Sequence, residues 1–246
     1  MTQPNKVLWP FFVAILLFPS RVAAQSVLPG KSGSQQAEGT PKVRLEAAYG
    51  RLPLSFEPNE GQTDRRVKFL SRGAAKTLFL TSTEAVLVLR SGRENDEGLS
   101  RLANTEKLDS QESVLRMKLL GASRDAEVKG LERLPGKSNY FIGNDPRKWR
   151  PGVAEYCRVR YSEIYPGVDL VYYGNQRELE YDFILAPGAD PQQIRVAIQG
   201  ASKLWVDADG NAVLRCKAGD IRLQKPRIYQ EVSGSAMLQA LRSVLM

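Results

Sequence analysis

The fold is decided by the stretch Glu178-Leu179-Glu180-Tyr181-Asp182-Phe183-Ile184. Charged and large apolar residues alternate along it, and successive side chains of a β-strand point to opposite faces. The stretch therefore predicts a strand with one face in a core and three carboxylates on the other face. Residues 168–173, just before it, are rich in β-branched and aromatic side chains and predict a second strand.

Similar short segments recur along the chain, each closed by Gly, Ser, Asn or Asp, and no long segment has apolar residues at helical spacing. Asp209 and Gly210 predict a hairpin turn, because glycine accepts a positive φ, and residues 143–146 predict another turn. Regular short strands are typical of an antiparallel sandwich or an open barrel. We expect an all-β, antiparallel β-sandwich-like domain of many short strands. The further strands expected are residues 67–70, 77–81, 85–89, 114–119, 139–142 and 194–198.

The N-terminus has the features of an export signal. Lys6 precedes an apolar run over residues 7–19, which is short for a membrane span and contains two prolines. Small residues follow, so we expect cleavage between Ala24 and Gln25. The alternative is an uncleaved membrane helix. Cleavage predicts a secreted or cell-surface protein with no permanent membrane span.

Composition divides the chain further. Residues 1–24 are the expected signal peptide, and residues 25–50 are a polar leader that lacks the apolar surface needed to offset its ordering entropy. Residues 51–233 form the expected all-β domain, in which residues 91–113 are expected to be a long exposed loop. Residues 234–246 are an atypical tail.

The chain is basic, with a net charge of +8 that falls to +6 when Lys6 and Arg21 leave with the signal. Bases and acids are interleaved, which is also typical of an ordinary solvated surface. The densest basic cluster contains Arg147, Lys148 and Arg150 and is the first candidate for binding an anionic partner. The partner itself is unknown. We expect a cell-surface polysaccharide or a protein, not nucleic acid, because no nucleic-acid fold signature accompanies the charge.

No histidine is present. Mechanisms that pair histidine with serine or cysteine are therefore excluded, as are zinc sites with imidazole ligands. Two cysteines cannot supply four thiolates to a metal. We expect no catalytic residue, no cofactor and no metal site, and thus not an enzyme.

The two cysteines, Cys157 and Cys216, lie in strand-like segments. In an exported protein they predict one disulfide, provided that their strands are neighbours. Two separate buried thiols are the alternative.

Three motifs allow a functional and a structural interpretation. Asp207 and Asp209 resemble the start of a calcium loop but lack the later glutamate, so a hairpin is favoured. The carboxylates of Glu178, Glu180 and Asp182 have the spacing of a glycosidase acid and base, but an exposed strand face has the same pattern. Aromatic residues in the second half suit sugar stacking or core packing, and we favour packing. They are Trp149, Tyr161, Tyr165, Tyr172, Tyr173 and Trp205.

Several segments together resemble a known family. The first runs Leu52-Pro53-Leu54-Ser55-Phe56-Glu57-Pro58-Asn59-Glu60-Gly61-Gln62, and others cover residues 67–73, 78–81, 134–146, 165–175, 179–191 and 225–230. They resemble a domain of unknown function at the N-terminus of large bacterial cell-surface proteins, where it precedes β-propeller repeats of the SBBP type. The resemblance implies location and architecture, but no reaction and no site residues. It also suggests a truncated or frameshifted end, because the tail after Gly234 departs from the family pattern.

Overall fold

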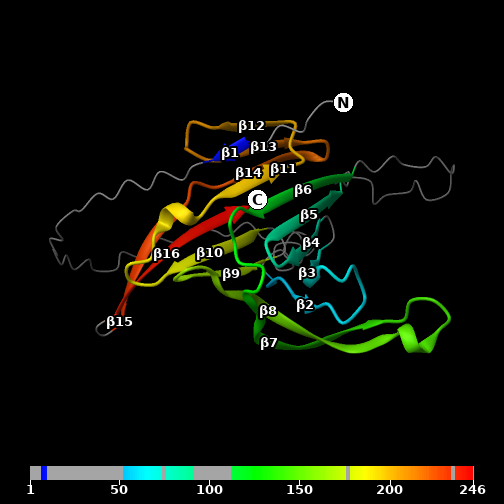
Figure 1. Cartoon of the computed structure of the whole chain (residues 1–246). Helices are drawn as coiled ribbons and strands as arrows, with labels where there is room; N and C mark the ends of the chain where they lie inside the picture. Colours follow the sequence, from blue (N-terminus) through cyan, green and yellow to red (C-terminus); the bar gives the residue numbers. More distant parts are fainter. Residues whose placement is uncertain are drawn as a thin grey trace, which may run out of the picture.

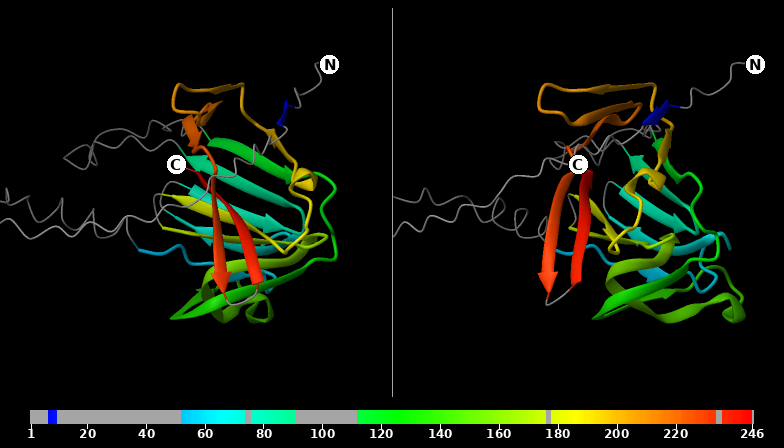
Figure 2. Two further views of the ribbon diagram at one scale, coloured as in Figure 1. Left: turned by 90° about the vertical axis from the view of Figure 1, so that its left-hand side faces the viewer. Right: turned by 60° about the vertical axis from the view of Figure 1, so that its left-hand side comes forward.

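The computed structural model describes residues 7–9, 52–73, 76–90, 112–175, 178–233 and 236–245. Two antiparallel β-sheets pack face to face over one core (Figures 1 and 2). The helical elements in this part of the chain are two short 3₁₀ turns, η2 (Pro146–Lys148) and η3 (Pro191–Gln193). The expected all-β, sandwich-like fold is confirmed.

The first sheet has seven strands in the order β1-β11-β6-β5-β4-β3-β2. In β6 the two faces of the sheet alternate strictly: residues 113, 115, 117 and 119 are buried while those between are exposed. The strands are β1 (Val7–Trp9), β2 (Glu57–Pro58), β3 (Val67–Arg72), β4 (Lys76–Thr81), β5 (Glu84–Arg90), β6 (Glu112–Leu119) and β11 (Val196–Gln199).

The second sheet has nine strands in the order β12-β13-β14-β16-β10-β9-β8-β7, with β15 paired to β16. The predicted hairpin at Asp209 and Gly210 joins its first two strands and is confirmed. The strands are β7 (Glu127–Tyr140), β8 (Arg150–Tyr165), β9 (Val168–Gly174), β10 (Leu179–Leu185), β12 (Lys203–Val206), β13 (Ala212–Cys216), β14 (Gly219–Leu223), β15 (Arg227–Ser233) and β16 (Ala236–Leu245).

Two strands are much longer than the sequence predicts. β7 has 14 residues and β8 has 16, and together they form a hairpin that extends beyond the sandwich (Figure 1). The expectation of uniformly short strands is wrong for this pair. No residue of β7 is fully buried, so this strand lacks the alternating pattern that identifies β10.

The core is built from both sheets, and a row of aromatic rings crosses β8, β9 and β10. Tyr161, Tyr172, Tyr181 and Phe183 are buried, with successive ring centroids 5.9, 5.8 and 5.9 Å apart. Burial raises the pKa of Tyr181 to about 12, because the charged phenolate is disfavoured away from water. Packing, the favoured interpretation of these tyrosines, is confirmed for Tyr161 and Tyr172.

The tail that the sequence marks as atypical forms β16. This strand pairs with β10 from Leu179↔Leu245 to Leu185↔Gln239, and with β15 on its other side. The tail is thus an interior strand of the second sheet. Of the expected loop over residues 91–113, the last two residues belong to β6 and the rest lie outside the described residues.

Within the expected signal peptide, the structure describes β1, which pairs antiparallel with β11. Cleavage after Ala24 would remove β1 and leave β11 at the edge of the sheet. The cleavage site at Ala24 and Gln25 and the leader over residues 25–50 lie outside the described residues. Within the described ranges, no helix has the length and apolar character to cross a membrane.

The expected disulfide between Cys157 and Cys216 is wrong. Both cysteines are free thiols, and their strands, β8 and β13, have four other strands between them in the sheet order. Adjacent strands are about 4.8 Å apart, so these cysteines are far beyond the reach of a disulfide. The alternative of two separate thiols holds, although Cys157 is only partly buried. Burial raises the pKa of both thiols.

Gly130 gives the β7–β8 hairpin a close contact that a residue with a β-carbon could not make. A β-carbon at this position would lie 2.4 Å from the ring of Tyr156, which crosses over the glycine from β8. The same ring makes an edge contact with Phe69 of the first sheet, at 6.2 Å between centroids. The glycine therefore lets Tyr156 lie between the hairpin and the sandwich.

We expect Gly130→Ala to lower the free energy of unfolding by about 1–3 kcal/mol, because the new methyl group displaces the Tyr156 ring. Urea denaturation followed by circular dichroism measures the change. In a Tyr156→Ala background the same substitution should cost far less, and equal costs in both backgrounds would contradict the contact.

Lys76, at the start of β4, is a half-buried cation. It borders a small cavity whose lining includes Leu54, Leu78, Leu87 and Leu179. Desolvation lowers the pKa of Lys76 from 10.5 to about 8, although the nearby Glu178 carboxylate acts in the opposite direction. Between pH 8 and 10.5 the unfolded state binds more protons than the folded state, so this lysine makes stability rise with pH.

Lys76→Met should raise the free energy of unfolding at pH 7 by on the order of 1 kcal/mol, a figure that allows for the partial exposure of the ammonium group. The advantage should shrink as the pH increases from 8 toward 10.5. Lys118→Met, at an exposed position on β6, is the matched control and should show neither effect. A pH-independent gain for Lys76→Met would contradict desolvation of the ammonium group as the cause.

Candidate functional site

A hollow of about 490 Å³ opens on the outer face of the first sheet. Its floor is formed by Phe79 of β4 and Val86 of β5, which lie directly opposite each other and are each partly exposed. Their neighbours along the strands, including Leu78, Leu80 and Leu87, are buried on the core face. The hollow is therefore lined by the outer side of the same strands whose inner side forms the core.

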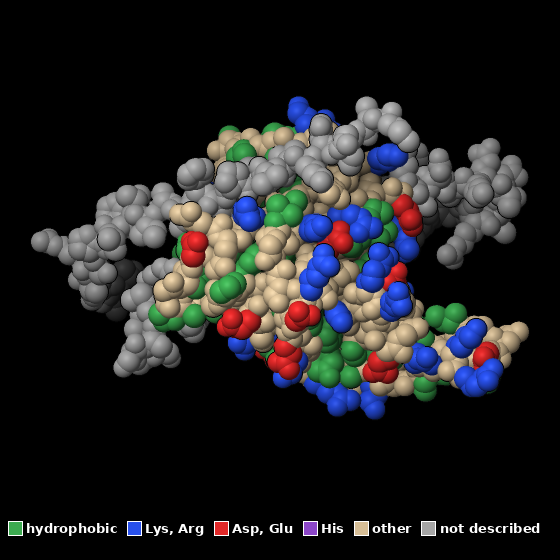
Figure 3. Space-filling model, viewed as in Figure 1, with side chains coloured by type: hydrophobic (Ala, Val, Ile, Leu, Met, Phe, Trp, Pro, Cys, Tyr) green, Lys and Arg blue, Asp and Glu red, His purple; other side chains and the backbone are tan. Residues whose placement is uncertain are grey.

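Hydroxyl groups and charges surround the apolar floor. Thr63, Thr81, Ser82 and Thr83 supply the hydroxyls, and Ser82 and Thr83 form the turn between β4 and β5. The charged lining residues are four bases, Arg66, Lys68, Arg116 and Arg124, and two acids, Asp64 and Glu84. Their formal charges leave an excess of two positive charges. Figure 3 shows lysine and arginine side chains gathered over this part of the surface, with fewer acids among them.

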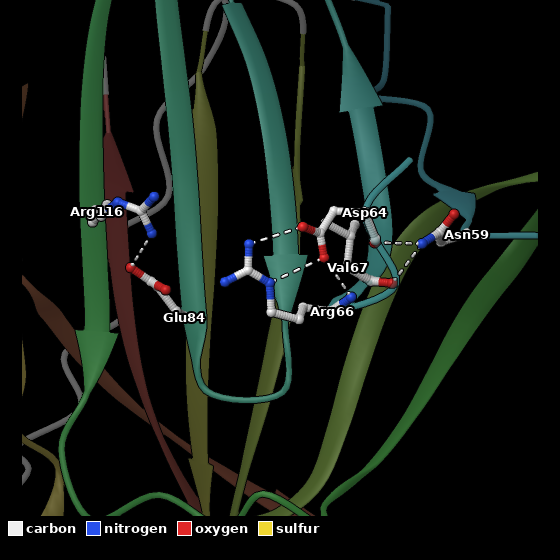
Figure 4. Close-up of polar contacts among 6 residues, drawn as sticks. All are labelled: Asn59, Asp64, Arg66, Val67, Glu84 and Arg116. Carbon is white, nitrogen blue, oxygen red and sulfur yellow. Dashed lines mark hydrogen bonds and ion pairs between the residues drawn. The ribbon is translucent and has the colours of Figure 1, made fainter. Parts of the chain in front are cut away.

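The two acids are each held by an arginine (Figure 4). Arg66 donates to both oxygens of Asp64, at 3.0 and 2.8 Å, and Nη1 of Arg116 lies 3.0 Å from Oε1 of Glu84. The hydrogen bonds from Arg66 hold the pKa of Asp64 well below its usual range. Within the described residues, Lys68 and Arg124 form no ion pair. These two bases remain available to an incoming anion.

Lys68 lies at an irregularity of β3 beside the hollow. The pairing of β3 with β4 shifts between Val67 and Phe69, so Lys68 is an extra residue with no partner opposite. Such a β-bulge redirects a side chain and increases the local twist. In β3 it leaves Lys68 exposed between two buried apolar residues.

Asn59 shapes the loop that forms one wall of the hollow. Its amide nitrogen donates to the carbonyls of Asp64 and Val67, at 2.8 and 3.0 Å (Figure 4). Its amide oxygen accepts from the backbone N–H groups of Gly61 and Thr63, at 3.1 and 3.3 Å. One side chain thus uses both donors and its acceptor to close the loop.

The sequence-predicted basic cluster does not assemble into a single anion site. Arg147 is paired with Asp145, and Arg150 donates to the carbonyls of Glu60, Arg147 and Trp149 at 2.6 to 2.9 Å. Lys148 is exposed on η2. All three lie at the end of the β7–β8 hairpin, on a different part of the chain from the hollow.

The predicted row of carboxylates on β10 is only partly exposed. Asp182 is buried, and its two oxygens accept hydrogen bonds from the hydroxyls of Tyr173 and Tyr229, at 3.0 and 2.7 Å. Glu180 is partly exposed and lies opposite Tyr173. Asp182 is therefore a structural acceptor that anchors β15 to the sheet.

The suggested calcium motif is a hairpin, in which Asp207 accepts from Asn211, and the described residues contain no cluster that could hold a metal.

A second polar cluster was not predicted from the sequence. Glu57 of β2 is buried and accepts hydrogen bonds from the hydroxyls of Ser138 and Tyr140, both on β7. Ser138 also lies 2.8 Å from Glu155. Desolvation and the bond to Glu57 raise the pKa of Tyr140 to about 12. Because Glu57 is enclosed, the cluster serves to attach the hairpin to the first sheet.

Asn59→Ala should disorganise this wall of the hollow and lower the free energy of unfolding by about 1–3 kcal/mol, because backbone groups lose their partners. Asn59→Asp keeps the acceptor but places a carboxylate oxygen against the carbonyls of Asp64 and Val67, so its cost should be at least as large as that of Asn59→Ala. Chemical denaturation of both variants tests the order, and a neutral Asn59→Ala would contradict the role of the side chain.

Comparison with known proteins identifies one family. A family model described as "Domain of unknown function (DUF7948)" matches residues 56–239. A search of curated proteins and a search of solved structures each found no match.

Proposed function

Because the chain belongs to the DUF7948 family of domains of unknown function, we propose from its own residues that it is a non-catalytic interaction module that binds an acidic polysaccharide. The hollow on the first sheet is the binding site. The observation that carries the proposal is the apolar floor of Phe79 and Val86 within a rim of bases and hydroxyls.

The chemistry of the hollow matches a sugar acid. An aromatic ring packs against the C–H face of a sugar, while threonine and serine hydroxyls exchange hydrogen bonds with its hydroxyl groups. A carboxylate on the sugar would be attracted by Lys68 and Arg124, which form no ion pairs within the described part of the chain. The hollow is also open, as binding to the middle of a long polymer requires.

Catalysis on a glycan by the carboxylates of β10 is the less favoured alternative. Asp182 is covered by Tyr173 and Tyr229, which occupy both of its oxygens. Glu180 would need a second carboxylate facing it across a bound sugar. Hydrolysis of a polysaccharide that is abolished by Glu180→Gln would support the enzyme and contradict our proposal.

Export to the cell surface is the second part of the proposal. It is supported by the basic and apolar N-terminus with small residues before Gln25, and by the resemblance to domains that precede SBBP-type propeller repeats. Acidic polysaccharides are common at such surfaces, so location and ligand agree. N-terminal sequencing of the exported protein tests the cleavage site.

Arg116→Gln should weaken binding of polygalacturonate about tenfold, because the rim loses a cation and leaves Glu84 unpaired near the ligand. Phe79→Thr should also weaken binding, with less change in its salt dependence, because the sugar loses its apolar contact. Isothermal titration calorimetry at two salt concentrations measures both effects.

Arg222→Gln is the matched control. Arg222 is on β14, is exposed to a similar extent as Arg116 (54% against 48%) and is also paired with a carboxylate. The substitution removes the same charge away from the hollow and should leave affinity nearly unchanged. Equal losses for the two arginine variants would show that net charge alone attracts the polymer, and the hollow would then not be the site.

A further inference from the structure

The end of the β7–β8 hairpin exposes large apolar side chains beside basic ones. Phe141, Ile142 and Trp149 are 63%, 60% and 36% exposed and lie within nine residues of each other. These residues belong to the segment 141–149, which we call the hairpin tip and which projects from the sandwich (Figure 1). Figure 3 shows apolar and basic side chains together at the end of this projection.

The tip is held in a defined shape. Phe141 and Trp149 pack edge to face, with centroids 5.3 Å apart, and the indole N–H donates to the carbonyl of Gly143 at 3.1 Å. The indole therefore has its polar group satisfied within the tip. Arg150 ties the base of the tip to the carbonyl of Glu60, and Asp145 caps η2 by accepting from the N–H of Arg147. The apolar side chains are exposed without a need for rearrangement on binding.

The charge of the tip is positive. Its acid, Asp145, is bonded at both oxygens by the Arg147 side chain, at 3.0 and 3.1 Å. Lys148 is exposed and forms no ion pair within the described ranges. The positive charge of Arg150 is not offset by an acid, because its three hydrogen-bond acceptors are neutral carbonyls. An approaching surface thus meets apolar groups surrounded by cations.

We propose that the hairpin tip docks on a bilayer that contains anionic lipids, with Phe141, Ile142 and Trp149 in the interfacial layer and Lys148 and Arg147 among the headgroup phosphates. Aromatic residues next to lysine and arginine are typical of segments that lie in this layer. A protein partner fits less well, since a stable protein interface covers about 800 Å² on each side and the tip is a narrow projection. The proposal is independent of the hollow.

The test is sedimentation of the full chain with vesicles of phosphatidylcholine that contain about 30 mol% phosphatidylglycerol, at about 0.1 M salt. Phe141→Ser/Trp149→Ser should bind at least tenfold more weakly than the parent. Lys148→Gln should bind about fivefold more weakly to these vesicles and equally to pure phosphatidylcholine. The parent and every variant contain the apolar residues 7–19, so any contribution of these residues to binding is the same in all of them.

Val206→Ser/Ile228→Ser is the control, because it removes exposed apolar groups from β12 and β15 and should leave binding unchanged. Trp149 gives a direct signal in a Trp9→Phe/Trp205→Phe variant, where it is the remaining tryptophan. Its emission should shift to the blue and be quenched by brominated lipid. Unchanged emission on bound vesicles, or equal binding by the parent and the Phe141→Ser/Trp149→Ser variant, would overturn the proposal.

Discussion

Two tyrosine hydroxyls that are carried into the space between the sheets are paired with main-chain carbonyls, and this pairing aligns the two sheets. The hydroxyl of Tyr161 crosses the core to the carbonyl of Thr81, and that of Tyr165 reaches the carbonyl of Leu120. Each bond joins β8 of the second sheet to the end of a strand of the first. The sandwich therefore has a fixed alignment at the end where Thr81 lines the hollow.

The hollow depends on this alignment, and one buried apolar residue, Val67, is part of its lining. Thr81 is both an acceptor for the core and a lining residue, while Phe79 and Val86 are each flanked along their strands by two buried apolar residues. Glu84 lies between two arginines and is bonded to Arg116. The acids of the rim thus orient the guanidinium groups and reduce the positive charge of the hollow.

The alternation of apolar and polar residues in the sequence predicted much of the fold, because buried and exposed positions alternate along a strand with the same period of two residues. The alternation at residues 178–184 identified β10, and the outward position of Arg116 follows from the same rule in β6. Burial of Asp182 was not predictable, because it depends on Tyr229, which is distant in sequence. The part of β7 before residue 139 was missed because it has no buried face, and the cysteine pairing failed because strand order is not a local property. The hollow combines residues 63 to 124 from several elements, and no sequence motif singled it out.

The loop closed by Asn59 has a consequence for how the domain can diversify. The side chain of Asn59 bonds only to main-chain atoms of residues 61, 63, 64 and 67, so these four bonds do not themselves require particular side chains at those positions. Mutations at Thr63 and Arg66 can alter the polarity or charge of this wall while these bonds stay in place, whereas the carboxylate of Asp64 also accepts from the backbone N–H of Arg66 and helps to hold the loop. In proteins that share this frame, the chemical character of the wall can therefore vary at these positions without a change of scaffold, as the loops of antibodies vary on a constant framework.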